Sequence, residues 1–415
     1  MSANIINLAA AIIFAMALIH TFTAKLFEGL AHRHPSHAGL FHLLGEVEVV
    51  FGFWSFILII VMALLAGGTE ALNYVETRHY TEPLFVFVIM VVAASNPVLL
   101  SVKHAIGWIA RIVPTDTTLA QTWLCLAIVP LVGSFITEPA AMTLAALMLS
   151  PMVFRQRMPE WLKYATLGVL FVNVSIGGTL TSYAAPPVLM VAATWQWDSA
   201  FMMAHFGWKA AIAVFINATT ICYLLRKHVA VPVDTIKEKA APLTVSIIHL
   251  LFLFGVVVFA HHPVVFIGLF LLFLGFTQAY SRFQTPLILK EGLLVGFFLA
   301  GLVVLGGMQQ WWLQPVVSGL EPLQLFFGAV ALTAITDNAA LTYLGSLIVG
   351  IPDDAKYMLM AGAVAGGGLT VIANAPNPAG VALLKRGFKD QSIGAPQLLL
   401  GALAPTLVAI LLFLI

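Results

Sequence analysis

Apolar runs of about 20 residues recur from near the first residue to the last, and they limit the possible folds more than any other feature. A run of this length is what an α-helix needs to cross the hydrocarbon core of a bilayer. Because charged or turn residues separate the runs, the chain is expected to be an all-α polytopic membrane protein. About ten crossings are predicted, at 4–24, 44–66, 83–101, 162–194, 205–225, 245–260, 263–280, 289–307, 355–387 and 396–415.

The composition excludes several classes of protein. Of the 415 residues, 61% are hydrophobic and 9% are charged, whereas soluble domains carry about 25% charged residues. A soluble enzyme and a disordered regulator are therefore excluded, and the net charge of +1 argues against a nucleic-acid partner. Both cysteines, Cys125 and Cys222, lie inside apolar runs, so no disulfide framework is predicted. We expect a multi-pass protein of the bacterial inner (plasma) membrane, without a cofactor, whose partners are the lipid bilayer and small inorganic ions.

Two segments, 118–154 and 322–350, fit poorly as single crossings. Each is about 30 residues long with a polar break at its middle, a pattern typical of re-entrant hairpins. If both hairpins return to their side of entry, 16 of the 19 Lys and Arg residues lie on the inner side, with only Arg78, Lys209 and Lys356 outside. Membrane insertion favours this asymmetry. If either segment were a single crossing, every later loop would lie on the opposite side of the membrane and the asymmetry would be lost. The charge pattern therefore supports both hairpins.

An internal repeat coincides with the breaks in these helices. Residues 136–144 (ITEPAAMTL) and 335–343 (ITDNAALTY) are identical at five of nine positions, at an offset of 199. Paired glycines and an Ala-Pro step follow each hairpin, at 177–186 and 367–376, at an offset of 190. Since the two hairpins enter from opposite sides in the predicted topology, the halves are inverted copies, as in many secondary transporters.

The repeat predicts the organisation of the chain. A first span with an inner loop occupies 1–39, and the most polar internal stretch marks an inner linker with a connecting span at 228–262. The remaining segments are repeat 1 at 40–227, with hairpin 118–154 and broken span 162–194, and repeat 2 at 263–415, with hairpin 322–350 and broken span 355–387.

Two acidic residues, Glu138 and Asp337, occupy matching positions in the middle of the hairpins, with no Lys or Arg within ten residues of either. An ionisable group at mid-membrane costs roughly 2.5–3.5 kcal/mol, and such groups usually mark ion or proton routes. Burial favours the neutral carboxyl group and a bound cation favours the charged one, so each group can hold a proton or a metal ion in turn. A structural alternative is that each carboxylate caps the half-helix that follows it. Capping and transport are compatible.

Hydroxyl and amide side chains near the breaks supply the hard oxygen ligands that a small alkali cation prefers. A sodium site is therefore predicted at each carboxylate. The predicted cation- and proton-binding residues are Glu138 with Ser134, Thr137, Asn173 and Thr179, and Asp337 with Thr333, Thr336, Asn338, Thr370 and Asn374.

Inverted halves that each carry a hairpin and an unwound Asn/Gly/Thr/Pro span resemble the ion transporter superfamily, and within it the NhaD-type bacterial sodium/proton antiporters. In those antiporters each tip has a hydroxyl residue, three others, then Asp-Asn. Residues 333–338 fit this pattern, whereas residues 134–139 carry Glu138 and Pro139 instead, and a proline supplies no amide oxygen. The Ser-Asn-Thr tips of the related anion symporters are absent. The resemblance implies a homodimer and elevator-like movement of the hairpin-bearing domains.

The predicted function is secondary active transport that exchanges sodium or lithium for protons by alternating access. Substitution of Asp337 by Asn is expected to abolish it. The alternative is a sodium-coupled symporter of a small anion such as a carboxylate or bicarbonate. An embedded enzyme is disfavoured because the spans contain no nucleophile–base pair or HExxH motif. Duplicated broken helices favour alternating access over a fixed channel.

Overall fold

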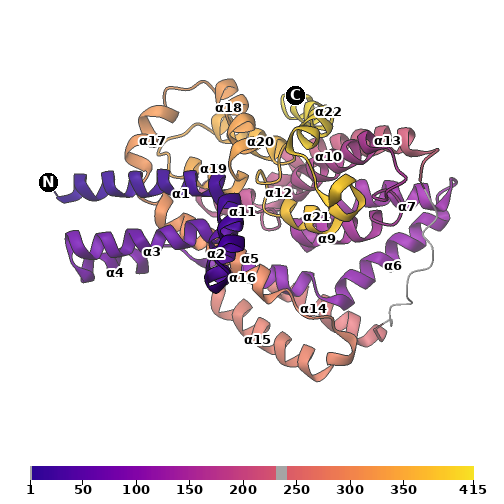
Figure 1. Cartoon of the computed structure of the whole chain (residues 1–415), viewed down its shortest axis with the longest axis horizontal. Coiled ribbons are helices and arrows are strands. Elements are labelled where there is room, and N and C mark those ends of the chain that lie inside the picture. Colours follow the sequence, from indigo (N-terminus) through magenta and orange to yellow (C-terminus); the bar gives the residue numbers. More distant parts are fainter. Residues whose placement is uncertain (1, 230–240) are drawn as a thin grey trace. The chain divides into compact units, whose positions relative to one another are not determined.

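The computed structural model describes residues 2–229 and 241–415, and all regular elements within these ranges are helical (Figure 1). This confirms the predicted all-helical class for the described residues. Four helical segments are long and apolar enough to cross a membrane, and up to six are if each of two bent pairs forms one span. The four are Glu48–Ala66, Ser199–Leu225, Leu289–Gly306 and Ala395–Phe413. The chain thus has the helices of a multi-pass membrane protein, while the count of about ten crossings stays a prediction.

Helices of intermediate length account for several of the other expected crossings. Helices α14 (Leu243–Val258) and α15 (Pro263–Ala279) have 16 and 17 residues, close to the lower limit of about 17 for a span. The single crossing predicted at 83–101 stays a prediction, because α5 (Thr81–Ala93) and α6 (Asn96–Ile112) are separate helices bent by 62°, which fits either a broken span or a re-entrant loop. Pro97 at the start of α6 explains the break, since proline cannot donate the backbone hydrogen bond that a continuous helix needs.

The chain forms two compact units, and each unit draws on both halves of the sequence. The first consists of Met1–Phe87, Leu289–Glu321 and Tyr343–Pro352. The second consists of Val88–Ile288, Pro322–Thr342 and Asp353–Ile415. The two compact units therefore do not coincide with the two halves of the sequence. The predicted repeat boundaries stay a prediction. Of the predicted linker 228–262, residues 230–240 lie outside the described residues.

The first unit is organised around two helices that approach closely. A Cβ atom added at Gly301 in α16 would run into the backbone of Gly52 in α3, so small residues permit this packing, as is common between membrane helices. An ion pair between Lys290 Nζ and Glu46 Oε1, 2.9 Å apart, also joins these two segments. The helices lying wholly in this unit are α1 (Ser2–Arg33), α2 (Ala38–Gly45), α3 (Val47–Ala66), α4 (Gly68–Glu76), α16 (Leu289–Gly306) and α17 (Gln310–Val317).

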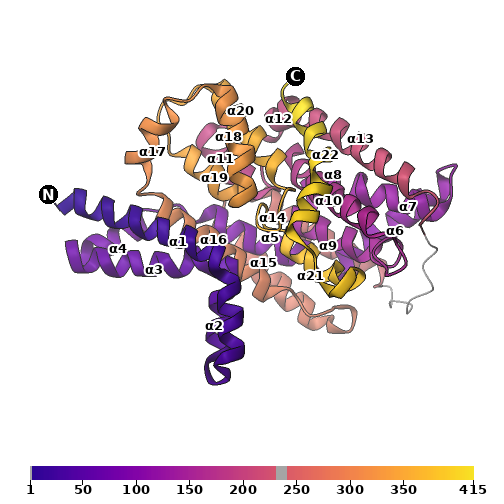
Figure 2. The same cartoon turned by 45° about the horizontal axis from the view of Figure 1, so that its top comes forward.

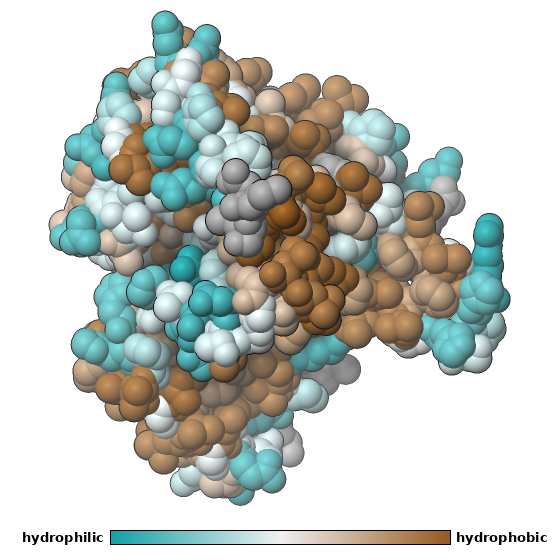
Figure 3. Space-filling model, turned by 90° about the vertical axis from the view of Figure 1, so that its left-hand side faces the viewer, coloured by the Kyte–Doolittle hydropathy of each residue, from teal (hydrophilic) through white to brown (hydrophobic). Residues whose placement is uncertain are grey.

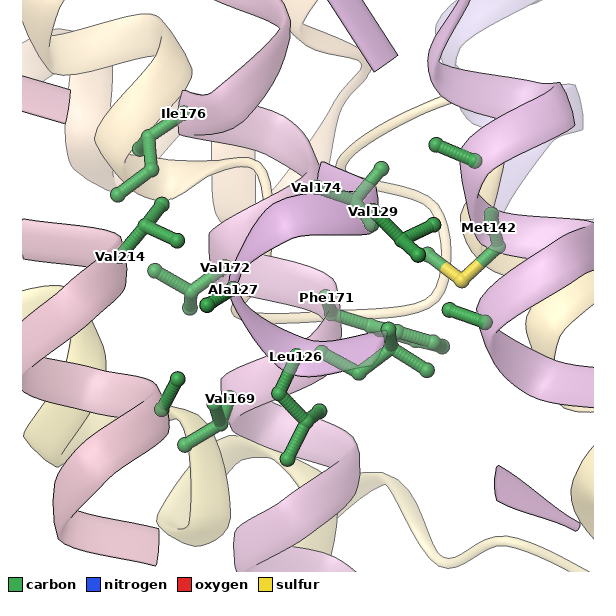
Figure 4. Packing of buried hydrophobic residues seen from close by; sticks show 14 of the residues in the cluster. Leu126, Ala127, Val129, Met142, Val169, Phe171, Val172, Val174, Ile176 and Val214 are labelled. Carbon is green, nitrogen blue, oxygen red and sulfur yellow. The ribbon is translucent and has the colours of Figure 1, made fainter. Parts of the chain in front are cut away.

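The second unit contains most of the helices and the larger core. Helices α10 (Glu160–Gly177), α13 (Trp208–Leu225) and α22 (Ala395–Phe413) pack against one another (Figures 1 and 2). Buried apolar side chains such as Phe171 and Leu126 fill the space between α7, α8, α9, α10 and α13 (Figure 4). Besides α6, α14 and α15, its helices are α7 (Thr117–Leu126), α8 (Ile128–Ile136), α9 (Glu138–Leu149), α10 (Glu160–Gly177), α11 (Pro186–Trp195), α12 (Ser199–Met202), α13 (Trp208–Leu225), α18 (Pro322–Ile335), α20 (Asp353–Gly366), α21 (Asn377–Leu384) and α22 (Ala395–Phe413).

Segment 118–154 folds back on itself within the second unit. Helices α7 and α8 are bent by 44° relative to each other. Helix α9 then returns along α7, because Cys125 Sγ lies 3.8 Å from Met148 Sδ and Thr122 Oγ1 lies 3.9 Å from Met152 Sδ. The turn is at Thr137. This is the path that a hairpin requires, and its depth in a bilayer stays a prediction.

Segment 322–350 is broken at the equivalent place, but it packs differently. Helix α18 ends at Ile335 and α19 (Asn338–Ser346) begins three residues later. Helix α18 lies along α20, and the chain from Tyr343 to Pro352 belongs to the first unit. A second re-entrant hairpin therefore also stays a prediction.

Both long segments that the sequence marks with glycine and proline are interrupted. Helix α10 ends at Gly177 and, after a short 3-10 turn at Gly178–Leu180, the helix resumes as α11 at Pro186. In the second half, α20 ends at Gly366 and α21 begins at Asn377. We name the stretches between these helices the first break (178–185) and the second break (367–376).

Large apolar side chains are exposed along several helices. Phe56, Ile60 and Leu64 of α3 are 58, 59 and 81% exposed, and Phe254 of α14 is 65% exposed. On the face shown in Figure 3, apolar side chains form broad brown areas between smaller polar ones. Such areas are uncommon on soluble monomers and mark surfaces that meet lipid or protein.

Candidate functional site

Glu138 is the first residue of α9, immediately after the turn of the first hairpin-shaped segment. Helix α8 ends at Ile136 and α9 begins at Glu138, so the carboxylate lies at a helix N-terminus, where backbone N–H groups are free and the helix dipole favours negative charge. The residue between, Thr137, has φ 78° and ψ 150°, a conformation that is nearly exclusive to glycine. The turn is therefore strained at the position that presents Glu138.

The Glu138 side chain is fully buried, and only one of its two carboxylate oxygens has a hydrogen-bond partner in the described part of the chain. Its Oε2 accepts a hydrogen bond of 2.9 Å from Asn374 Nδ2. Its Oε1 has no hydrogen-bond partner among the described residues. The carboxylate lies against Gly178, where an added Cβ would collide with Oε1. Because a buried charge without compensation is very unfavourable, this group requires a proton or a cation.

Other unpartnered polar atoms gather around the same turns. Eleven buried side-chain N or O atoms of the described residues lack a hydrogen bond, and seven of them belong to the two tips, the second break and the first residue of α21. Native proteins bond nearly all such groups, so a cluster of exceptions indicates a place that takes water or an ion. The seven are Thr137 Oγ1, Glu138 Oε1, Thr333 Oγ1, Asn338 Oδ1 and Nδ2, Asn374 Oδ1 and Asn377 Oδ1.

Direct contacts join the second tip to the second break, and the second break to the end of α10. The backbone N–H of Asn338 donates to the carbonyl of Ala373 over 3.1 Å. A Cβ added at Gly367 would lie 2.9 Å from Asn338 Nδ2 and would collide with the hydroxyl of Ser175. Asn377 Nδ2 donates to the carbonyl of Gly367 over 2.8 Å. The unpartnered Asn338 amide of the second half therefore lies near Ser175, at the end of α10.

Asp337 has a different environment from Glu138. It is half-buried, and its Oδ1 accepts hydrogen bonds from the N–H groups of Ala339 (2.8 Å) and Ala340 (3.1 Å). Asp337 therefore caps α19, which is the structural role that sequence alone leaves open. It is also near enough to Glu138 for the two negative charges to repel each other. Such repulsion is relieved when a cation lies near both groups.

Four of the predicted hydroxyl ligands bind the backbone. Ser134 Oγ donates to Gly177 O (2.7 Å) and accepts from Leu180 N–H (2.9 Å), which ties the first tip to the first break. The other three donate to carbonyls of their own or a neighbouring helix: Thr179 to Ile176, Thr336 to Leu332 and Thr370 to Ala334. Of the predicted hydroxyls, Thr137 and Thr333 remain without a partner in the described structure.

Two predicted amides lie elsewhere than the sequence suggests. Asn173 donates to the carbonyls of Leu126 and Val214 and accepts from Asn217, so its side chain is used within the core of the second unit and is not brought to Glu138. Asn374, assigned to the Asp337 site from sequence, instead binds Glu138. The physical reason is that the second break packs beside the first tip, so the two halves share one site.

Sequence reasoning missed two residues that shape this site. Gly178 provides the space that the Glu138 carboxylate occupies. Asn377 bridges the second break from the first turn of α21. The paired glycines and the Asn-Ala-Pro-Asn-Pro run were the available signals, but a sequence pattern does not say which atoms a glycine makes room for.

The donors are oxygen atoms from carboxylate, hydroxyl and amide groups, which suit a hard cation. No cluster of three or more His, Cys, Asp or Glu residues suitable for a transition metal occurs in the described ranges.

The chain was compared with known proteins and protein families. Among curated proteins, none matches this chain in sequence. The family described as "Putative Na+/H+ antiporter" matches residues 5–415, a range that includes both tips and both breaks. The chain belongs to this family of Na+/H+ antiporters.

Proposed function

We propose that the protein exchanges Na+ or Li+ for H+ by alternating access, and that Glu138 holds the cation and the proton in turn. The observation that carries the proposal is the buried Glu138 carboxylate, with one oxygen bound to Asn374 and the other without a partner. A sealed carboxylate in this state is stable only when it is protonated or paired with a cation. Competition between these two ligands for one group couples their movement in opposite directions.

The neighbouring atoms support a cation site of several oxygens. Thr137 Oγ1, Asn374 Oδ1 and Asn338 Oδ1 are buried without hydrogen-bond partners. We propose that they complete the coordination of a sodium ion at Glu138. The N-terminus of α9 lowers the cost of the charged carboxylate while the cation is bound.

Asp337 takes a second role in this proposal. Its cap holds the N-terminus of α19, and so it positions Asn338, the next residue. Its charge also attracts a cation toward the site. A sodium ion at Asp337 itself, with Thr333, Thr336 and Thr370 nearby, is retained as the second proposed site.

The alternative of sodium-coupled anion symport is disfavoured by the same carboxylate. An anion at the N-terminus of α9 would meet the negative charge of Glu138 in a water-poor setting, where like charges repel strongly. The described residues of the two tips and breaks include no Lys or Arg that would offset this repulsion.

Further features of the proposal rest on resemblance and charge. We place the chain in the bacterial inner membrane, with 16 of the 19 Lys and Arg residues inside. We also propose inverted repeats of the ion transporter superfamily, NhaD-like tips, a homodimer and elevator movement.

The proposal is tested by reconstituting the purified protein in liposomes with an internal pH dye. Addition of external NaCl or LiCl to acid-loaded vesicles should raise internal pH, whereas choline chloride should not. Replacing chloride by gluconate should leave the sodium response unchanged. Sodium-dependent uptake of bicarbonate or a labelled carboxylate without proton countermovement would refute exchange and favour symport.

A further inference from the structure

The bend between α7 and α8 has a cause in the sequence. The two helices meet at Ala127 at an angle of 44°, and Pro130 lies in the first turn of α8. A helix that continued through this point would bond the N–H of residue 130 to the carbonyl of Leu126. Proline has no N–H, so it leaves the Leu126 carbonyl without its helical partner.

The side chain of Asn173 takes the place of the missing donor. Its Nδ2 donates to the carbonyl of Leu126 over 2.8 Å and to the carbonyl of Val214 in α13 over 3.3 Å. Its Oδ1 accepts from Nδ2 of Asn217 over 3.0 Å. Since the amide nitrogen faces two carbonyls and the oxygen faces a donor, the network fixes the orientation of this amide. The side chain is fully buried, so these bonds form away from bulk water.

The far end of α8 is attached to α10 as well. Ser134 Oγ donates to the carbonyl of Gly177, the last residue of α10, over 2.7 Å. The two helices also approach closely, because a Cβ added at Gly177 would lie 2.7 Å from the backbone of Pro130. Asn173 and Gly177 are four residues apart and therefore lie on one face of α10. Helix α8 is thus held against this face by an amide at its base and a hydroxyl near its tip.

The angle of α8 determines where Glu138 lies. Glu138 follows α8 after the single residue Thr137. Helix α8 has nine residues and is about 13 Å long, so a rotation of about 10° at its base would move its far end by about 2 Å. A shift of that size is enough to break the hydrogen bond of 2.9 Å between the carboxylate and Asn374.

We propose that Asn173 is a positioning residue for Glu138. It replaces the backbone donor that Pro130 removes, and it thereby holds the bend that brings the first tip to the second break. The amide does not touch the cation but acts through Leu126 and α8. Its effect on transport rests on the proposed ion exchange, whereas its effect on the position of the tip does not, so the two effects are tested separately.

Two variants of the purified protein in liposomes separate positioning from packing. Asn173→Ala leaves the Leu126 carbonyl without its side-chain donor, so it should lower the thermal unfolding midpoint and raise the KM for sodium. Pro130→Ala restores an N–H to this carbonyl and removes the cause of the bend, so it should keep a midpoint near that of the wild type and still raise KM. Because such sites depend on placement within about 0.5 Å, each rise should be at least about tenfold. Pro130→Ala keeps the test valid if Asn173→Ala unfolds.

The double variant Asn173→Ala/Pro130→Ala gives the sharpest comparison. The restored N–H should return part of the lost thermal stability, whereas KM should stay raised because the bend is not restored. Thr166→Val is the matched control, since it removes another buried hydrogen bond of α10, from Thr166 Oγ1 to the carbonyl of Leu162. It should lower the midpoint and leave KM unchanged. Recovery of KM together with stability in the double variant, or an equal rise of KM in the control, would overturn the proposal.

A distance measurement follows the tip without relying on transport. Spin labels are placed at Phe135 near the end of α8 and at Trp161 in α10, both exposed, after the native Cys125 and Cys222 have been replaced by alanine. Electron–electron resonance should show a label separation that differs from the wild type by about 2 Å or more in both bend variants, and no difference in the control. Such a difference supports the proposal even if the wild type exchanges no sodium. An unchanged separation in both bend variants would overturn it.

Discussion

Asn374 donates a hydrogen bond from Nδ2 to Glu138 Oε2 over 2.9 Å, although the two residues are 236 positions apart in the chain. The bond joins the tip of the first half to the break of the second. Its consequence is that a single buried site draws ligands from both halves. A movement that separates these segments changes the environment of the carboxylate.

Substitution of Asn374 by Ala should weaken sodium binding. The change removes a hydrogen bond to a buried charged group, which is worth about 1.5–3 kcal/mol, so the KM for sodium should rise at least about tenfold. Sodium-driven proton flux in liposomes measures this. Asn73→Ala, at an exposed asparagine of α4, serves as the control and should leave KM unchanged. An Asn374→Ala variant with a wild-type KM would show that the amide does not take part.

Substitution of Gly178 by Ala should impair exchange through contact with Glu138. The added Cβ would collide with the carboxylate, and overpacking of this kind typically costs about 1–3 kcal/mol. We expect a large fall in maximal flux with the helical content retained by circular dichroism. Gly275→Ala adds the same methyl group where nothing lies within 4 Å and should behave as the wild type. Normal flux in Gly178→Ala would contradict the placement of the carboxylate.

The strained conformation of Thr137 should lower the stability of the fold, while its hydroxyl group contributes to sodium binding. Its φ of 78° and ψ of 150° cost of order 1–3 kcal/mol for a residue other than glycine. Thr137→Gly relieves this strain and removes the unpartnered hydroxyl, so it should raise the thermal unfolding midpoint and lower sodium affinity. Thr137→Ser keeps the hydroxyl and should retain most of the affinity. If Thr137→Gly is both less stable and fully active, the strained turn has no role in the site.

Acidic pH should oppose sodium binding. A proton and a sodium ion compete for Glu138, so protonation removes the form of the carboxylate that binds the cation. Where the protonated form predominates, each fall of one pH unit should raise the apparent KM for sodium about tenfold. Initial rates measured over a series of pH values and sodium concentrations test this sign and slope. A KM that is constant with pH would exclude competition at one group.

The fold class follows from the sequence because apolar runs of membrane length leave few alternatives to helices. The helix breaks at Gly177 and Gly366 also follow from local chemistry, because glycine pairs and prolines interrupt helical hydrogen bonds. The packing of α18 along α20 cannot be predicted from the sequence in this way. That choice depends on which apolar faces meet, and hydropathy alone does not encode it.

Only part of the candidate site could be predicted from the sequence. The repeat locates Glu138, and its burial follows from the apolar residues on both sides. The repeat also predicts that Asp337 is equivalent to Glu138. The shorter Asp337 side chain, however, lies at the start of α19 and accepts hydrogen bonds from the N–H groups of Ala339 and Ala340. Likewise the sequence cannot tell that Asn374 crosses to the first half while Asn173 pairs with Asn217. These are contacts between segments far apart in the chain.

The most direct test of the central claim compares Glu138→Gln with Asp337→Asn in acid-loaded liposomes challenged with sodium. Glutamine keeps the size of Glu138 but cannot exchange a proton for a cation, so sodium-driven alkalinisation should fall to the level of empty vesicles. Asparagine caps a helix about as well as aspartate, so Asp337→Asn should keep α19 in place and leave the thermal unfolding midpoint near that of the wild type. It removes the charge of the second proposed cation site, so sodium-driven exchange should be lost here too. Sodium-driven proton movement that persists in Glu138→Gln would contradict the account.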